Sequence, residues 1–194
     1  MSGFLASFAI SFGVIFLAEL GDKSQLMAMT FAARYRAITV LIAITIATAL
    51  VHLVSVLLGA VVGVALPTHV INVIAGIAFL GFAAWTLRGD ELTAEEAAKA
   101  ERERSRSVLL TVGLAFFLAE LGDKTMLATI TLATDHGLLG TWVGSTLGMV
   151  AADALAIVVG HLLGARLPER TIRIGAAVTF VLFGVLLIIE GVRG

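Results

Sequence analysis

The octapeptide FLAELGDK occupies residues 16–23 and recurs unchanged at residues 117–124. Each copy places a Glu, an Asp and a Lys inside a stretch that is otherwise apolar enough to cross a lipid bilayer. A charged side chain at the centre of a membrane helix costs about 2.5–3.5 kcal/mol on insertion scales. Because the same three charges occur twice, we expect pairing or a bound ion to offset this cost. The repeat is therefore the first candidate for a functional site.

The sequence around the two copies predicts an all-α integral membrane protein with six transmembrane helices. Of the 194 residues, 59% are hydrophobic and only 14% are charged, and the mean hydropathy of +1.05 lies above the range of soluble globular domains. Six apolar runs are long enough to cross about 30 Å of hydrocarbon. They cover residues 3–31, 38–66, 69–88, 108–134, 138–166 and 171–192.

The second half of the chain repeats the first at a constant offset of 101 residues, the separation of Phe16 and Phe117. Outside the octapeptide, Gly59 and Pro67 align with Gly160 and Pro168 at the same offset. Each half contains three predicted spans, so the second half enters the membrane from the opposite face. We predict two inverted three-helix repeats, residues 1–88 and 108–194, of the kind on which many alternating-access transporters are built.

The distribution of Lys and Arg predicts the orientation of the chain. Apart from the two octapeptide lysines, ten basic residues lie at or beyond the ends of the first, third and fifth spans, and only Arg193 lies on the other side. The compact loops of the chain favour the cell membrane, and the bias of basic residues predicts that both termini lie outside. It also predicts a cytoplasmic linker at residues 89–107, which we expect to form a short solvated helix. The ten residues are Arg34, Arg36, Arg88, Lys99, Arg102, Arg104, Arg106, Arg166, Arg170 and Arg173.

The acids of the two octapeptides are candidate metal ligands. On a continuous helix Glu19 and Asp22 share a face, as do Glu120 and Asp123, because residues three apart lie on the same side. If the two faces meet, four carboxylates gather in one place. The chain has no Cys, which excludes thiolate sites, and oxygen donors suit Mg²⁺, Ca²⁺ and Mn²⁺ rather than Zn²⁺ or Cu²⁺.

Residues beside the acids are expected to assist an ion site. Gly21 and Gly122 are candidate hinges, because the low helix propensity of glycine permits local unwinding that frees backbone carbonyls. Ser24 and Thr125 add hydroxyls after each motif, and Gln25 adds an amide in the first copy only.

Two readings of Lys23 and Lys124 remain open. With the four acids they sum to a charge of −2, which one divalent cation neutralises, and crowded carboxylates should hold protons that an arriving cation displaces. That coupling is the physical basis of a cation/proton exchanger. In the alternative, each lysine forms an intrahelical salt bridge with the glutamate four residues earlier and only braces the helices.

Asp153 and His52 occupy equivalent positions in the two halves, in the fifth and second predicted spans. Both are titratable, so either can relay protons, and we favour Asp153 for proton coupling. A single histidine in a membrane helix more often hydrogen-bonds a neighbouring helix.

The segments ELGDKS at residues 19–24 and ELGDKT at residues 120–125 resemble the paired E-x-G-D-K-[S/T] signature of the Gdt-type family of small cation/proton exchangers. That family includes bacterial manganese exporters and Golgi manganese and calcium transporters. The resemblance covers essentially the whole chain. It implies that Glu19, Asp22, Glu120 and Asp123 bind Mn²⁺ or Ca²⁺ that leaves the cytoplasm in exchange for protons.

The expected function is therefore secondary transport, with the two halves rocking around the acids. The ion is a substrate, and we expect no cofactor, no enzymatic activity and no nucleic-acid partner. A membrane-embedded hydrolase is disfavoured because no Arg lies within residues 3–31 or 108–134. An exporter of organic solutes is disfavoured because four acids with few aromatic residues form a poor pocket. Selectivity for Mn²⁺ over Ca²⁺, and whether the chain forms a homo-oligomer, stay open.

Overall fold

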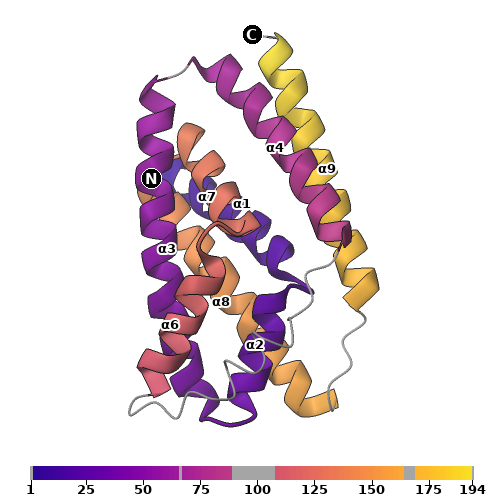
Figure 1. Cartoon of the computed structure of the whole chain (residues 1–194). Coiled ribbons are helices and arrows are strands. Elements are labelled where there is room, and N and C mark those ends of the chain that lie inside the picture. Colours follow the sequence, from indigo (N-terminus) through magenta and orange to yellow (C-terminus); the bar gives the residue numbers. More distant parts are fainter. Residues whose placement is uncertain (1, 66, 89–107, 164–168, 194) are drawn as a thin grey trace.

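The computed structural model describes residues 2–65, 67–88, 108–163 and 169–193 (Figure 1). Within these ranges all regular structure is helical, which confirms the predicted all-α class. The first half supplies α1 (Ser2–Glu19), α2 (Lys23–Ala32), α3 (Ala37–Ala65) and α4 (Thr68–Arg88). The second supplies α6 (Val108–Glu120), α7 (Lys124–Asp135), α8 (Leu138–Leu163) and α9 (Glu169–Arg193). The predicted linker at residues 89–107 lies outside the described residues.

Two of the six predicted spans are broken in the middle. The axes of α1 and α2 differ by 77° across a short break, and together they make one candidate membrane span. The first predicted span of the second half is likewise divided into α6 and α7. Among the described residues, α3 and α8 are each long and apolar enough to cross a membrane alone. The breaks fall within the two octapeptides, so the expectation that each motif lies on one continuous helix was wrong.

Helices from the two halves interdigitate. α1 packs along α8, α6 and α7 pack along α3, and α4 packs along α9. The α4–α9 pair lies at one edge of the molecule, beside the helices that carry the breaks (Figure 1). The most extensive contacts of the described helices therefore join different halves, and this arrangement brings the two octapeptides together.

Glycines on one face of α8 allow α1 to approach backbone to backbone. Gly140, Gly144 and Gly148 are four residues apart, so they lie on one side of the helix. A Cβ atom at Gly144 would lie 2.5 Å from the carbonyl oxygen of Phe8, and one at Gly148 would lie 2.6 Å from that of Phe12. Small residues of this kind are the usual basis of close helix packing in membranes. This contact fixes the position of α1, and hence of Glu19 at its end, against α8.

We predict that Gly144→Ala destabilises the protein and that Gly81→Ala does not. The added methyl at position 144 overpacks the α1–α8 contact, which costs about 1–3 kcal/mol. At Gly81, in α4, a Cβ atom meets nothing within 4 Å, so the better helix propensity of Ala leaves stability equal or higher by about 0.5–1 kcal/mol. Thermal unfolding in detergent measures both variants. Equal melting temperatures would contradict the packing described for α1 and α8.

Candidate functional site

The first octapeptide folds into a turn between two helices. α1 ends at Glu19, and α2 begins at Lys23. Gly21 has a φ of 76°, in the left-handed region that glycine adopts without a steric penalty. Asp22 is extended, with φ −87° and ψ 167°, and precedes α2 as its N-cap residue. The turn is closed by a 3.1 Å hydrogen bond from the amide of Asp22 to the carbonyl of Glu19.

The second octapeptide forms the same turn. α6 ends at Glu120 and α7 begins at Lys124, Gly122 has a φ of 80°, and Asp123 is extended with φ −75° and ψ 168°. The amide of Asp123 donates to the carbonyl of Glu120 at 3.2 Å. Both candidate hinge glycines therefore lie at real helix breaks, where the sequence suggested local unwinding. Their action as hinges during transport stays a prediction.

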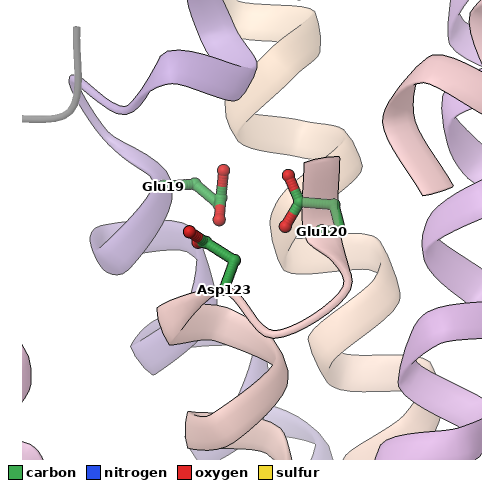
Figure 2. A group of neighbouring side chains, drawn as sticks. All are labelled: Glu19, Glu120 and Asp123. Carbon is green, nitrogen blue, oxygen red and sulfur yellow. The ribbon is translucent and has the colours of Figure 1, made fainter. Parts of the chain in front are cut away.

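The two turns bring three acids into one buried group. Glu19, Glu120 and Asp123 each offer a carboxylate oxygen, and these oxygens all lie within 4.8 Å of one another. Glu19 comes from the end of α1, Glu120 from the end of α6 and Asp123 from the start of α7, and their side chains converge (Figure 2). Each residue is at most 3% exposed. The group contains oxygen donors from both halves, as the sequence predicted for a metal site.

Asp22, the fourth predicted ligand, forms an ion pair instead. Its Oδ1 lies 2.5 Å from Nζ of Lys124, and both side chains are buried. In the equivalent pair, Nζ of Lys23 lies 3.7 Å from Oδ1 of Asp123. Each lysine thus pairs with the aspartate of the other repeat. The alternative of intrahelical bridges is wrong, because α1 and α6 end before the lysines and the two octapeptides are linked crosswise.

Hydroxyl groups orient the two glutamates. Oγ of Ser24 donates a short hydrogen bond to Oε2 of Glu19, and Oγ1 of Thr125 donates to Oε2 of Glu120 at 3.0 Å. The other carboxylate oxygens, Oε1 of Glu19 and Oε1 of Glu120, are buried and have no hydrogen-bond partner within the described part of the chain. A buried polar atom without a partner costs about 1–3 kcal/mol, or more if it is charged. A bound cation or a proton would therefore stabilise both oxygens.

The amide of Gln25 has a structural role that the sequence did not reveal. Its Oε1 accepts a 2.8 Å hydrogen bond from the amide of Gly21, and its Nε2 donates to the carbonyl of Ala152 at 2.8 Å. Gln25 therefore braces the first turn and joins it to α8. In the second copy, Met126 takes the same place, with its sulfur 3.2 Å from the amide nitrogen of Gly122. The sequence could not identify Ala152 as the partner, because every residue has a backbone carbonyl.

Asp153 lies beside the acid group and His52 is hydrogen-bonded elsewhere. Asp153 is 0% exposed, and neither carboxylate oxygen has a hydrogen-bond partner among the residues described. It follows Ala152, whose carbonyl oxygen accepts the hydrogen bond of Gln25 from the first turn. Nδ1 of His52 lies 3.3 Å from Oγ1 of Thr146 on α8, a contact that the sequence did not identify. The two equivalent positions therefore have different surroundings.

The chemistry of the group is that of a hard divalent-cation site. Carboxylate and hydroxyl oxygens are the donors present, and Mg²⁺, Ca²⁺ and Mn²⁺ prefer such oxygens. The described structure places the donors at two helix breaks, and irregular backbone at membrane depth is tolerated where it is buried in protein or lines a cavity. Substrate sites of transporters with inverted repeats are built in this way, from broken helices at the repeat interface.

We predict that Gly122→Ala destabilises the second turn through its backbone alone. A Cβ atom at Gly122 meets nothing within 4 Å, so the cost is that of a left-handed L-residue, about 1–2 kcal/mol. Gly122→Asn should cost less, because Asn adopts positive φ more readily. Gly113→Ala in α6 is the control, since its Cβ makes only an ordinary 3.7 Å contact with the carbonyl oxygen of Ala43. Melting temperatures in detergent should rank Gly113→Ala above Gly122→Asn and Gly122→Ala lowest, and any other order counts against the turn.

Comparison with known proteins identifies the family. A family model described as "Divalent cation/proton antiporter GDT1" matches residues 7–94 and again residues 108–194, in agreement with the internal repeat. A Vibrio cholerae protein described as "Putative manganese exporter" is 36% identical over 90% of this chain and 86% of its own length. The "Divalent cation/proton antiporter GDT1" of Saccharomyces cerevisiae is 27% identical over 97% of this chain and 85% of its own.

A GDT1-like protein of Synechocystis is 31% identical over 94% of this chain and 96% of its own length. The comparison with solved structures finds no match. Both matches of the family model fall on a half that contributes one turn and one glutamate to the buried acid group. The chain therefore belongs to the GDT1 family of divalent cation/proton antiporters, which are multi-pass membrane transporters and not enzymes.

Proposed function

We propose that this protein exports Mn²⁺ from the cytoplasm in exchange for protons and binds the ion at Glu19, Glu120 and Asp123. The observation that carries the proposal is the pair of buried glutamate oxygens without hydrogen-bond partners in the described structure. They come from different halves and lie with Asp123 within 4.8 Å. Such a group is stable only with a cation or with protons in it, and the exchange of one for the other is the reaction of an antiporter.

The choice of Mn²⁺ rests on the relative from Vibrio cholerae, whose description names manganese. Ca²⁺ accepts the same oxygen donors and differs mainly in coordination number and in the size of the cavity that it needs. A Ca²⁺/H⁺ antiporter is therefore the alternative, and a competition experiment decides between the two ions.

The interdigitated packing bears on how the site opens to each face. α1 is held against α8, and α6 and α7 are held against α3, so rigid rocking of the two sequence halves would disrupt the main helix contacts. We infer that the breaks at Gly21 and Gly122 absorb the motion, because hinge motions concentrate in a few residues between rigid elements. For orientation, the bias of basic residues supports cytoplasmic ends for α2, α6 and α8. The similarity to the Vibrio cholerae protein supports a location in the cell membrane.

We predict that Glu19→Gln and Glu120→Gln each lower Mn²⁺ transport by at least about tenfold. Loss of one charged contact of about 1.5–3 kcal/mol corresponds to roughly tenfold or more in affinity. Proteoliposomes supplied with Mn²⁺, Ca²⁺ and Mg²⁺ in competition, with internal pH recorded, measure ion and coupling together. Glu190→Gln, an exposed acid near the end of α9, is the control and should transport normally.

Wild-type protein that moves Ca²⁺ in preference to Mn²⁺ would support the alternative ion. Transport by the Glu19→Gln/Glu120→Gln double variant at the wild-type rate would refute the proposed site.

We predict that Asp153→Asn lowers the number of protons exchanged per Mn²⁺. We propose that Asp153 receives protons displaced from the site, because it is buried with unpartnered oxygens in the described structure and follows Ala152, whose carbonyl contacts Gln25 of the first turn. His52→Gln should change the ratio less, because His52 already contacts Thr146. Parallel measurement of Mn²⁺ flux and internal pH gives the ratio. An unchanged ratio in Asp153→Asn would exclude this role.

A further inference from the structure

The two lysine–aspartate pairs are equivalent in sequence but unequal in the structure. Lys124 and Asp22 are 2.5 Å apart, with 3% and 1% of their side chains exposed. Lys23 and Asp123 are 3.7 Å apart, with 19% and 1% exposed. Because the octapeptides are identical, this difference comes from the arrangement of the helices and not from the residues themselves.

The inequality decides which aspartate joins the acid group. Asp22, held by the shorter contact, is not in the group of described acids whose oxygens lie within 4.8 Å, whereas Asp123, in the longer contact, is in that group with Glu19 and Glu120. One carboxylate oxygen of Asp22, Oδ2, is buried and makes no hydrogen bond to any described residue. Each aspartate thus has two competing positive partners, the lysine of the other repeat and the ion.

Electrostatics requires that one of the two partners be present. Removing one member of a buried ion pair is strongly destabilising, because the other charge is left uncompensated. An aspartate released by its lysine must therefore bind the cation or a proton, and an aspartate that loses both must regain its lysine. The two halves have inverted topology, so a state in which they exchange conformations would face the opposite side of the membrane. The same exchange would interchange the short and long lysine contacts.

We propose that Lys23 and Lys124 are alternating positioning residues that determine which aspartate binds the ion in each state. In the arrangement described, Lys124 pairs with Asp22 and keeps it from binding the ion, which is bound by both glutamates and Asp123. In the opposite state Lys23 pairs with Asp123 and keeps it from the ion, and Asp22 binds the ion together with the same glutamates. This inference rests on the proposed function and extends it, because it assigns the lysines a role in switching rather than in bracing.

The test uses Lys23→Met and Lys124→Met, which keep the length of the side chain but remove its charge. Loss of Lys124 removes the contact that defines the described state and should favour the opposite one. Loss of Lys23 should favour the described state. Because the chain has no cysteine, a single Cys at Leu20 or at the equivalent Leu121 reports on each turn. The reporter is labelled in proteoliposomes with a membrane-impermeant maleimide applied to either face.

The two lysine variants are expected to shift labelling in opposite directions. Each reporter becomes more accessible in one variant and less accessible in the other, by at least about threefold. Mn²⁺ flux falls in both variants. Three-fold corresponds to a shift of about 0.65 kcal/mol between the two states. Lys→Arg at either position keeps the pair and should restore the wild-type labelling pattern. Where a Met variant does not fold, Lys→Gln replaces it.

Shifts in the same direction, or no shift while flux falls, would overturn the proposal and leave the lysines as braces. Failure of the proposed function is separate and visible in the wild type. If the wild-type protein moves no Mn²⁺, the proposed export of Mn²⁺ is refuted. If the wild-type protein moves Mn²⁺ but the two lysine variants show identical labelling, only the alternation of the lysines is refuted.

Discussion

The burial of five ionisable side chains at two helix breaks, with Lys23 partly buried beside them, is the constraint on which the rest of the structure depends. Carboxylates at membrane depth must meet cations or hydrogen-bond donors, and in this fold the lysine that pairs with each aspartate comes from the other half of the chain. Lys124 holds Asp22, and Lys23 lies near Asp123. Ser24 and Thr125 hold one oxygen of each glutamate. The two breaks therefore stabilise each other, and neither half can satisfy its charges alone.

Helix packing places the two turns with their charged side chains next to each other. The glycines of α8 let α1 approach closely enough for Glu19 to end beside α8, and Gln25 joins the first turn to the carbonyl of Ala152. α6 and α7 lie along α3 in the corresponding arrangement. Because the helices of the two halves interdigitate, the two breaks are in direct contact through the Lys124–Asp22 and Lys23–Asp123 pairs. This property suits a transporter that opens its site to one membrane face at a time.

Much of the fold could be predicted from sequence, because apolar length and internal repetition are strong local signals. The predicted run at residues 38–66 corresponds to α3 (Ala37–Ala65), and the run at 69–88 corresponds to α4 (Thr68–Arg88). The motif itself was predicted less well. The helical spacing of Glu19 and Asp22 suggested a shared face, but Gly21 takes a positive φ and ends that helix. The low helix propensity of glycine indicated where the helix could unwind. Only the backbone conformation in the structure shows that it unwinds there.

The sequence by itself determined the membrane environment, the two repeats, the oxygen donors of the motifs and the glycines at which unwinding could occur, because each of these depends on residues that are neighbours in the chain. The tertiary structure alone decided which charges meet. Lys124 and Asp22 are 102 residues apart in sequence, and nothing local distinguishes a bridge within one motif from a bridge between two. The difference between the two copies is likewise tertiary, because identical octapeptides acquire unequal contacts only from the helices packed around them.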